Sequence, residues 1–349
     1  MSIFRIAFHT SVIVAVLCAS LSGVSVTAGR LKSDVRQIVY LSQGRSAQSI
    51  HAYDLDSRRT IQLNREPLGF CCGPVVWSPD RQQLVVTFTP NTLLSEYYIV
   101  TLNGDFRRSL SALNPFTSID TLAWSPDGRF LTFEVRGTNS VSVYRTDVSS
   151  TDEAIRLTDS RGVNFGAAWS PDGRQIAFSA LQATGSAISL MNSDGSGQRQ
   201  LSPTAASFHR PSWSPDGEHI AFLENSGLTW DVMVMNNNGS DLRQMTMQAR
   251  VVSTLEWSPD GEGIVYTGII DDNEEIFVVD LSSGIVRQLT HTAAREISPG
   301  WSPDGRLILF ALREDDHYDI GVVGADGSDY RRIVENPERD FAPEWLQFE

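Results

Sequence analysis

The fold is decided by the turn Trp169-Ser170-Pro171-Asp172-Gly173 and the run Gln175-Ile176-Ala177-Phe178-Ser179 that follows it. Proline fixes φ, the aspartate side chain bonds its own backbone and glycine accepts positive φ, so the first segment predicts a tight turn. The apolar run after it is long enough for a strand and too short for a helix. Two more such runs, 187–191 and 199–202, lie on either side of the turn-forming segment 192–196. Together with the stretch that ends at Trp169, the unit therefore contains four short strands.

This unit is repeated along the chain. The tetrapeptide Trp-Ser-Pro-Asp begins at Trp77, Trp124, Trp169, Trp213, Trp257 and Trp301. Successive copies are separated by 47, 45, 44, 44 and 44 residues. Four short strands in a repeat of about 40 to 45 residues are typical of the blade of a β-propeller. We expect the turn aspartates to hydrogen-bond within their own turns and the repeated tryptophans to pack between blades.

The two ends of the repeated region complement each other. The segment 36–40, followed by 49–53 and 60–63, matches strands two, three and four of a blade without its first strand. The segment 341–348 matches a first strand without the rest. Joining them predicts an all-β, seven-bladed β-propeller of four-stranded blades, closed by pairing the C-terminal strand with the N-terminal strands. A six-bladed ring with loose ends is the alternative.

The first residues differ from the repeats. A basic start with Arg5 precedes a mostly apolar run from Ser11 to Leu21, and small residues precede Gly29, which is typical of a secretory signal peptide. We predict a signal peptide over residues 1–28, a single propeller domain over residues 29–349 and a periplasmic or secreted location. A membrane anchor is the alternative, although the run is shorter than the roughly 20 apolar residues that span a bilayer. We expect no transmembrane segment after cleavage.

Only two cysteines, Cys71 and Cys72, remain after the predicted cleavage. An exported protein meets an oxidising compartment. The adjacent pair forms either a strained disulfide or two reduced thiols. In neither state does the pair cross-link distant parts of the fold.

The composition restricts the partners and the chemistry. The chain has 28 Lys and Arg residues against 42 Asp and Glu residues, a formal net charge of −14. A protein that binds nucleic acid needs a cationic surface, so this class is excluded, and anionic membrane surfaces are disfavoured. The sequence contains no Gly-x-Ser-x-Gly elbow, which excludes the serine chemistry that depends on it. No motif predicts a cofactor.

The Trp-Ser-Pro-Asp-Gly turn, the Ile-Ala-Phe strand after it and the Asn-x-Asp-Gly-Ser turn resemble the propeller repeat of TolB-type proteins. The resemblance covers nearly the whole predicted mature chain and implies a β-propeller. Full TolB proteins carry an α/β domain before a six-bladed propeller, whereas strand-like sequence begins here soon after the predicted cleavage site. Propellers with this repeat also resemble oligogalacturonate lyases, which hold a divalent metal through histidines. That resemblance makes His209 and His291, on equivalent inter-blade loops, the candidate metal ligands.

Propellers usually act through loops that a rigid scaffold carries. The loops between blades and those between strands two and three should share one face, where aromatic and arginine side chains would surround a pore mouth. The candidate binding residues are Phe70, Asp120, Asn164, Phe165, Phe208, His209, Arg210, Trp230, Arg295, Glu296, Arg339, Asp340 and Phe341. The acidic runs 271–275 and 313–316 would form a negative rim on that face, which attracts a basic partner or a cation.

Together these observations predict an exported, monomeric propeller that acts as a rigid binding module. Its main expected partner is a protein in the cell envelope or outside the cell. The alternative is a glycan-binding propeller or one with metal-dependent polysaccharide lyase chemistry. Nothing in the sequence requires catalysis.

Overall fold

The described part of the chain consists of β-strands, mostly antiparallel, joined by turns and loops. The computed structural model describes residues 36–44, 48–64, 75–91, 94–110, 119–150, 152–159, 161–203, 207–247, 249–252 and 255–346. These residues belong to one compact unit, Val35–Glu349. None of them forms a helix that is long and apolar enough to cross a membrane. The predicted signal peptide, Phe70, Cys71 and Cys72 lie outside the described residues.

Four of the sheets contain four strands that follow the chain in order. The first consists of β4 (Val76–Trp77), β5 (Gln83–Asn91), β6 (Leu94–Thr101) and β7 (Phe106–Ser109). The second consists of β8 (Ile119–Trp124), β9 (Phe130–Arg136), β10 (Val141–Asp147) and β11 (Ile155–Arg156). The third consists of β20 (Glu256–Trp257), β21 (Gly263–Ile270), β22 (Asn273–Asp280) and β23 (Val286–Gln288). The fourth consists of β24 (Arg295–Trp301), β25 (Leu307–Glu314), β26 (His317–Gly324) and β27 (Arg331–Val334).

Two further sheets differ from this plan. A sheet of eight strands contains β12 (Asn164–Trp169), β13 (Gln175–Gln182), β14 (Gly185–Asn192), β15 (Arg199–Gln200), β16 (Ser207–Trp213), β17 (His219–Asn225), β18 (Trp230–Asn236) and β19 (Arg243–Gln244). One parallel residue pair, Ser186 with Ser207, joins β14 to β16 and so connects its two halves. The last sheet has the order β28 (Arg339–Trp345), β1 (Gln37–Gln43), β2 (Gln48–Asp54) and β3 (Arg59–Gln62).

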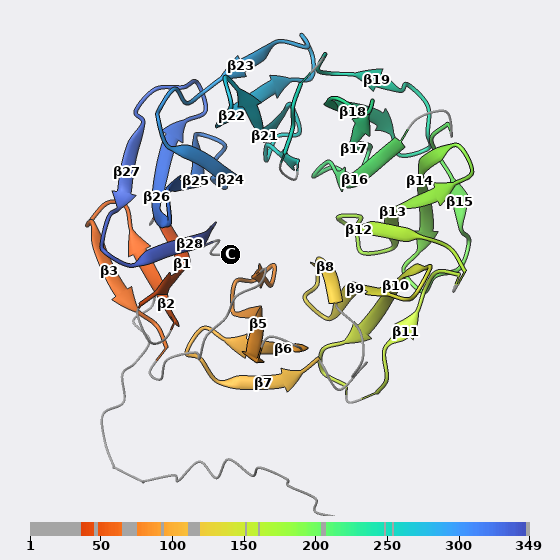
Figure 1. The fold of residues 1–349 in the computed structure, drawn as a ribbon, viewed down its shortest axis with the longest axis horizontal. Helices are drawn as coiled ribbons and strands as arrows, with labels where there is room; N and C mark the ends of the chain where they lie inside the picture. Colours follow the sequence, from red (N-terminus) through yellow and green to blue (C-terminus); the bar gives the residue numbers. More distant parts are fainter. Residues whose placement is uncertain are drawn as a thin grey trace, which may run out of the picture. The chain divides into compact units, whose positions relative to one another are not determined.

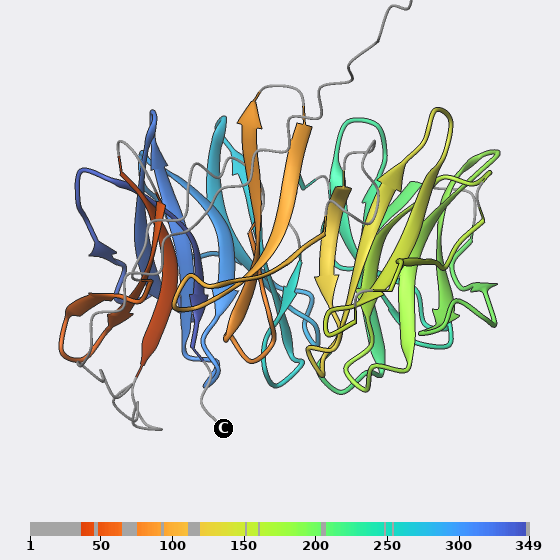
Figure 2. The same cartoon turned by 90° about the horizontal axis from the view of Figure 1, so that it is seen from below.

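The sheets stand radially around a common axis (Figure 1), and we call the cavity that their strands line along this axis the channel. The strands β8, β12, β16, β24 and β28 lie innermost, and the short fourth strands lie on the outside. Figure 2 shows the strands running up and down along the ring axis. β28 pairs with β1, with Ile38 opposite Trp345 and Gln43 opposite Arg339. This pairing confirms the predicted closure of the ring, and the arrangement is that of an all-β propeller.

Each Trp-Ser-Pro-Asp turn is held by the same two hydrogen bonds. In the turn after Trp257, Ser258 Oγ donates to Asp260 Oδ1 at 2.5 Å and accepts from Gly263 N at 2.8 Å. The same pair of bonds is made by Ser78, Ser125, Ser170, Ser214 and Ser302. The aspartates therefore recur because each turn needs a local acceptor, as the repetition predicted.

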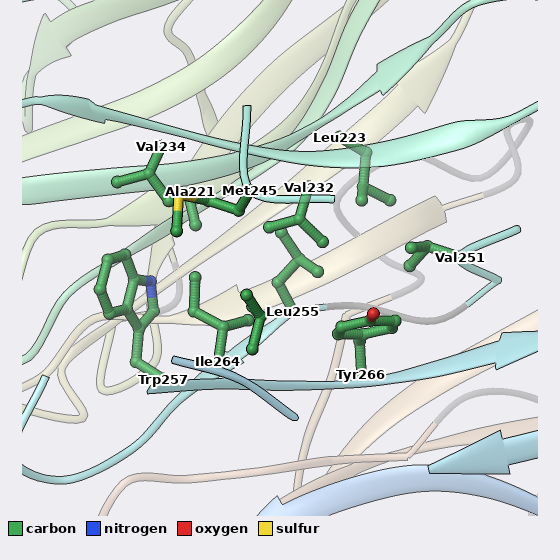
Figure 3. Close-up of a cluster of buried hydrophobic side chains, with 11 residues drawn as sticks. Ala221, Leu223, Val232, Val234, Met245, Val251, Leu255, Trp257, Ile264 and Tyr266 are labelled. Atoms are coloured by element: carbon green, nitrogen blue, oxygen red, sulfur yellow. The ribbon is translucent and has the colours of Figure 1, made fainter. Parts of the chain in front are cut away.

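The tryptophans of the repeat lie between adjacent sheets. Trp257 Nε1 donates to Ser212 O at 3.1 Å, and Trp213 Nε1 donates to Ala168 O at 3.2 Å. Each bond reaches back to the innermost strand of the preceding repeat. Figure 3 shows the buried cluster beside Trp257, where side chains of β17 and β18 pack against those of β20 and β21. The apolar cores therefore lie between neighbouring repeats and hold the channel wall in place.

An irregularity interrupts the inner strands. In β16 the register with β17 shifts between His209 and Ser212, and Arg210 adopts a φ of 54°. Equivalent shifts occur in β8, β12, β24 and β28. Bulges of this kind re-aim side chains and are frequent next to functional sites. The left-handed conformation of Arg210 is unfavourable for a residue with a Cβ and therefore needs support from its surroundings.

Candidate functional site

Residues at the same place in successive inner strands can be compared as one position. Two such positions that are adjacent along the strand face opposite sides of the sheet, because side chains alternate along a strand. The first position comprises Asp120, Asn164, Phe208, Glu296 and Asp340. The next position comprises Thr121, Phe165, His209, Ile297 and Phe341. Asn164, Phe208, Glu296 and Asp340 are buried, whereas Thr121, Phe165, His209 and Ile297 line the channel. The second position is therefore the one that a ligand in the channel can reach.

A cavity of about 1100 Å³ occupies the channel, and three of the candidate residues form one side of it. The ring centroids of Phe165 and His209 are 5.0 Å apart, and those of His209 and Trp230 are 4.9 Å apart in an edge-on contact. We call these three side chains the aromatic wall. They come from β12, β16 and β18, so the ring brings together residues from two successive repeats.

His209, at the centre of the aromatic wall, is half-buried. Burial lowers its pKa, and the neighbouring Arg210 guanidinium lowers it further. Its Nε2 lies 3.4 Å from the Ser186 Oγ. The imidazole is consequently neutral at pH 7, and it presents a polar ring edge without a charge.

Four charged side chains line the cavity, and two of them, Arg210 and Glu274, have opposite signs and lie in contact with its open space. Arg210 is exposed at the bulge of β16, and Glu274 projects from β22. Within the described part of the chain, neither makes a hydrogen bond or an ion pair. Both are therefore available to groups on a ligand.

A third charged residue, Glu134 of β9, has a structural contact instead. It is buried, and its Oε1 accepts a hydrogen bond from Gly166 N at 2.5 Å. Gly166 has a φ of 66° and lies at the bulge of β12. Glu134 thus fixes the backbone beside the aromatic wall.

Four candidate residues of the inner strands lie in the protein interior, which differs from the exposed loop positions that we expected. Phe208 is 3% exposed and packs edge-on against Phe222, with ring centroids 5.0 Å apart. Asn164 is also buried. The expectation failed because these residues belong to strands that begin earlier than the loop pattern suggested, and in those strands they point away from the channel.

The two buried carboxylic acids of this group have perturbed titration. Burial raises the pKa of Glu296 to about 7, and its Oε1 accepts from Thr292 Oγ1 at 2.5 Å. Burial also raises the pKa of Asp340 to about 6, and its Oδ2 accepts from Asn336 Nδ2 at 2.6 Å. Both carboxyls are enclosed by protein, and neither lines the cavity.

The other candidates lie around the ring. Arg295 and Arg339 are exposed at the starts of β24 and β28, and Arg339 lies 3.7 Å from the Asp316 carboxylate. Phe341 is half-buried against the core at the ring closure. Asp120 lies in β8, where its backbone is opposite Glu134.

The histidines suggested by the lyase resemblance have different surroundings. His209 belongs to the aromatic wall, whereas His291 is exposed on the loop after β23. Among the described residues, no three His, Cys, Asp or Glu side chains gather in a group that could hold a metal ion. The two histidines therefore do not form a metal centre with other described ligands.

Some residues of the cavity had no signal in the sequence. Glu134 and Arg136 at the end of β9 line it, as does Val252 in the loop before β20. A charged residue at the end of a strand is common on any surface. Only the curvature of the ring turns these positions toward one space.

Comparisons with known proteins agree with the geometry. A family model described as the TolB beta propeller domain (PD40) matches residues 22–227 and 121–349. A search of curated proteins gives no match. TolB from Acinetobacter baumannii has a similar structure, with a TM-score of 0.54 and 18% identity over 88% of this chain and 82% of that chain.

Two enzymes have structures that are also similar to this chain. The periplasmic gluconolactonase from Pseudomonas aeruginosa has a TM-score of 0.58 and 17% identity over 89% of this chain and 99% of that chain. An oligogalacturonate lyase from Vibrio parahaemolyticus has a TM-score of 0.57 and 13% identity over 88% of this chain and 87% of that chain. At these identities the likeness shows the fold alone. The family is shown by the two overlapping matches of the family model, and the chain belongs to the TolB β-propeller family.

Proposed function

We propose that this chain is a rigid binding module that receives a segment of a protein partner at the mouth of its channel. The aromatic wall carries the proposal, because it places three rings from two repeats on one side of a cavity of about 1100 Å³. Aromatic and arginine side chains supply much of the binding energy at protein interfaces. A preformed wall also loses little conformational entropy when a partner binds.

The groups around the cavity indicate what the segment offers. Phe165 and Trp230 present ring surface to apolar side chains. Arg210 pairs with a carboxylate, and Glu274 pairs with a cation or a hydrogen-bond donor. A peptide with an apolar side chain between charged groups of both signs would satisfy all of them.

We also propose that the protein is exported to the periplasm or the cell exterior. The composition of residues 1–28 supports this, since a basic start and an apolar run precede small residues. The partner would then belong to the cell envelope or its surroundings.

We infer further that the ring has seven blades. The two halves of the eight-stranded sheet, β12–β15 and β16–β19, each have the four-stranded plan of the other sheets. A single residue pair connects them. Counting these halves separately supports the blade number that the tryptophan spacing predicts.

The binding proposal is tested by cross-linked affinity capture from the envelope or culture fraction of the source organism. The bait is the mature chain, the site variant Phe165→Ala/Arg210→Glu, or a control variant Val286→Ala/Arg287→Ala, whose residues are exposed in the outer strand β23. Circular dichroism confirms that all three are folded.

We expect a partner that the parent and the control variant capture and the site variant loses. A partner that the site variant retains would contradict binding at the mouth. The same three proteins are applied to a glycan array. If the parent and the control variant bind a glycan and the site variant does not, the ligand of the channel mouth is a glycan and not a protein.

A further inference from the structure

Exposed apolar side chains lie on three loops in one sector of the ring, close in sequence to Trp230, Val252 and Glu274, which line the cavity. Leu228, in the hairpin between β17 and β18, is 93% exposed, and Met247, after β19, is 84% exposed. Ile270, at the hairpin between β21 and β22, is 41% exposed. We call these three side chains the apolar rim. Apolar residues gathered on a surface mark interaction sites more often than single ones do.

Backbone hydrogen bonds join the segments that carry the apolar rim. Trp230 N, beside the first hairpin, donates to Ala249 O at 3.0 Å. Ile269 N, beside the second hairpin, donates to Arg250 O at 3.0 Å. The loop 249–252 therefore connects the two hairpins, and it begins two residues after Met247.

Carboxylates border this surface on one side. Asp271 and Asp272 follow Ile270 directly and are exposed. Arg250 lies 3.4 Å from the Asp272 carboxylate, and Glu274 lines the neighbouring cavity. Arg210 lines the same cavity as Glu274, so two arginines stand against three carboxylates, and this sector keeps an excess of negative charge.

We propose that the apolar rim docks an amphipathic, basic segment of a protein partner. Its apolar side chains would cover Leu228, Met247 and Ile270, and its Lys or Arg side chains would lie beside Asp271 and Asp272. The inference extends the proposed binding function to a second surface, and it does not depend on the aromatic wall.

The negative charge beside the apolar rim distinguishes between three possible partners: a membrane, a second copy of the chain and a basic protein segment. An anionic membrane would be repelled by the exposed carboxylates. A second copy of the chain in a two-fold contact would bring like charges together, because both subunits use the same patch. A basic protein segment satisfies the apolar and the acidic groups at once.

The test uses a fluorescent synthetic peptide of leucine and lysine with helical amphipathic spacing. A second peptide has glutamate in place of every lysine. Binding is measured by fluorescence anisotropy with the parent, the rim variant Leu228→Ser/Met247→Ser, and a matched control Ile155→Ser/Ile285→Ser. The control residues are 56% and 59% exposed and lie at the outer strands β11 and β23.

We expect the lysine peptide to bind the parent and the control equally. The rim variant should bind it about tenfold more weakly, a loss in the range of interface anchors. The glutamate peptide should not bind, and added salt should weaken the lysine peptide because it screens the carboxylates.

Equal binding of the lysine peptide to all three proteins would overturn the inference, since it would reflect only attraction to an acidic protein. Dimerisation of the parent that the rim variant loses, measured by light scattering, would overturn it in favour of a second copy. Binding to phosphatidylglycerol vesicles that only the rim variant loses would overturn it in favour of a membrane. The Phe165→Ala/Arg210→Glu variant keeps the rim, so it should bind the lysine peptide whatever the capture experiment shows.

Discussion

Replacing Ser258 with alanine removes the hydroxyl that holds one of the repeated turns. Ser258 is 3% exposed, and its Oγ donates to Asp260 Oδ1 at 2.5 Å and accepts from Gly263 N at 2.8 Å. In the variant, Gly263 N at the start of β21 loses its side-chain acceptor in a buried place. The Asp260 carboxylate is exposed, so water can replace the lost donor there.

The expected loss follows from these two bonds. A buried donor without an acceptor costs about 1–3 kcal/mol, whereas a lost bond that water replaces costs little. We therefore expect Ser258→Ala to lower the free energy of unfolding by about 2 kcal/mol at pH 7. The matched control is Ser226→Ala, because Ser226 is exposed in the hairpin before β18, and it should change stability by less than about 0.5 kcal/mol.

The same bond has a pH signature. The hydrogen bond from Ser258 is the main cause that lowers the pKa of Asp260 below its ordinary 3.8. A carboxyl with a lowered pKa in the folded state stabilises the fold fully above its unfolded pKa, and this contribution is lost as the pH falls through the lowered value. The stability difference between the parent and Ser258→Ala should therefore shrink below pH 3.8.

Urea unfolding, followed by tryptophan fluorescence and by circular dichroism, measures both effects. Agreement of the two probes is needed before a single free energy is derived. If Ser258→Ala behaves like Ser226→Ala at pH 7, the hydroxyl does not hold the turn and the reasoning fails. A difference that stays constant as the pH falls would refute the role of the Asp260 carboxylate.

Three further predictions concern the turn, the core and the buried acids. Gly217 has a φ of 72°, and a Cβ added there would lie 3.6 Å from Pro171, an ordinary van der Waals contact. Gly217→Ala should therefore lower the free energy of unfolding in urea by about 1–2 kcal/mol through the strained backbone alone. An unchanged unfolding midpoint would contradict this. Phe208→Ala should lower the free energy of unfolding by about 3–5 kcal/mol because it leaves a cavity in the core. Phe165→Ala should lower it much less, because Phe165 lines the channel. Equal losses would contradict the placement of Phe208 in the core and Phe165 at the channel. Burial raises the pKa of Glu296 from 4.5 to about 7, so the free energy of unfolding of the parent should fall as the pH rises between these values. The Glu296→Gln variant should lack that fall. Equal pH dependence of the free energy of unfolding in the parent and the variant would refute this prediction.

The ring could be predicted from the sequence because its causes are local. The turn at Trp169-Ser170-Pro171-Asp172-Gly173 sets a hairpin by its own dihedral preferences and side-chain bonds. The recurrence of that turn then fixes the repeat length, and the complementary ends fix the closure through β28 and β1. None of these steps needs knowledge of distant contacts.

The candidate site could be predicted only in part, because side-chain direction depends on where each strand begins. Phe208 and His209 are neighbours in β16, yet Phe208 belongs to the core and His209 to the channel. A one-residue change of register reverses such an assignment. The 44-residue spacing aligns Phe208 with Glu296 and Asp340. This alignment indicates that the three residues share an environment, but it does not tell whether they face the core or the channel.

The aromatic wall required the three-dimensional ring. Phe165 and His209 come from equivalent positions of successive repeats, and Trp230 comes from a third strand. Their centroid distances of 5.0 Å and 4.9 Å depend on the angle between neighbouring sheets. The bulge at Arg210 that turns this guanidinium toward the cavity has no signature in the sequence, since arginine rarely adopts positive φ.

The central claim is that the channel mouth receives a partner, and site-specific photo-cross-linking tests it most directly. A benzoylphenylalanine residue replaces Val252, which lines the cavity and is 41% exposed, or Arg287 in the outer strand β23, and each protein is irradiated in the envelope or culture fraction of the source organism. We predict a discrete adduct from position 252 that the added Phe165→Ala change diminishes, and no adduct of that size from position 287. The same adduct from both positions, or from position 287 alone, would contradict binding at the channel mouth.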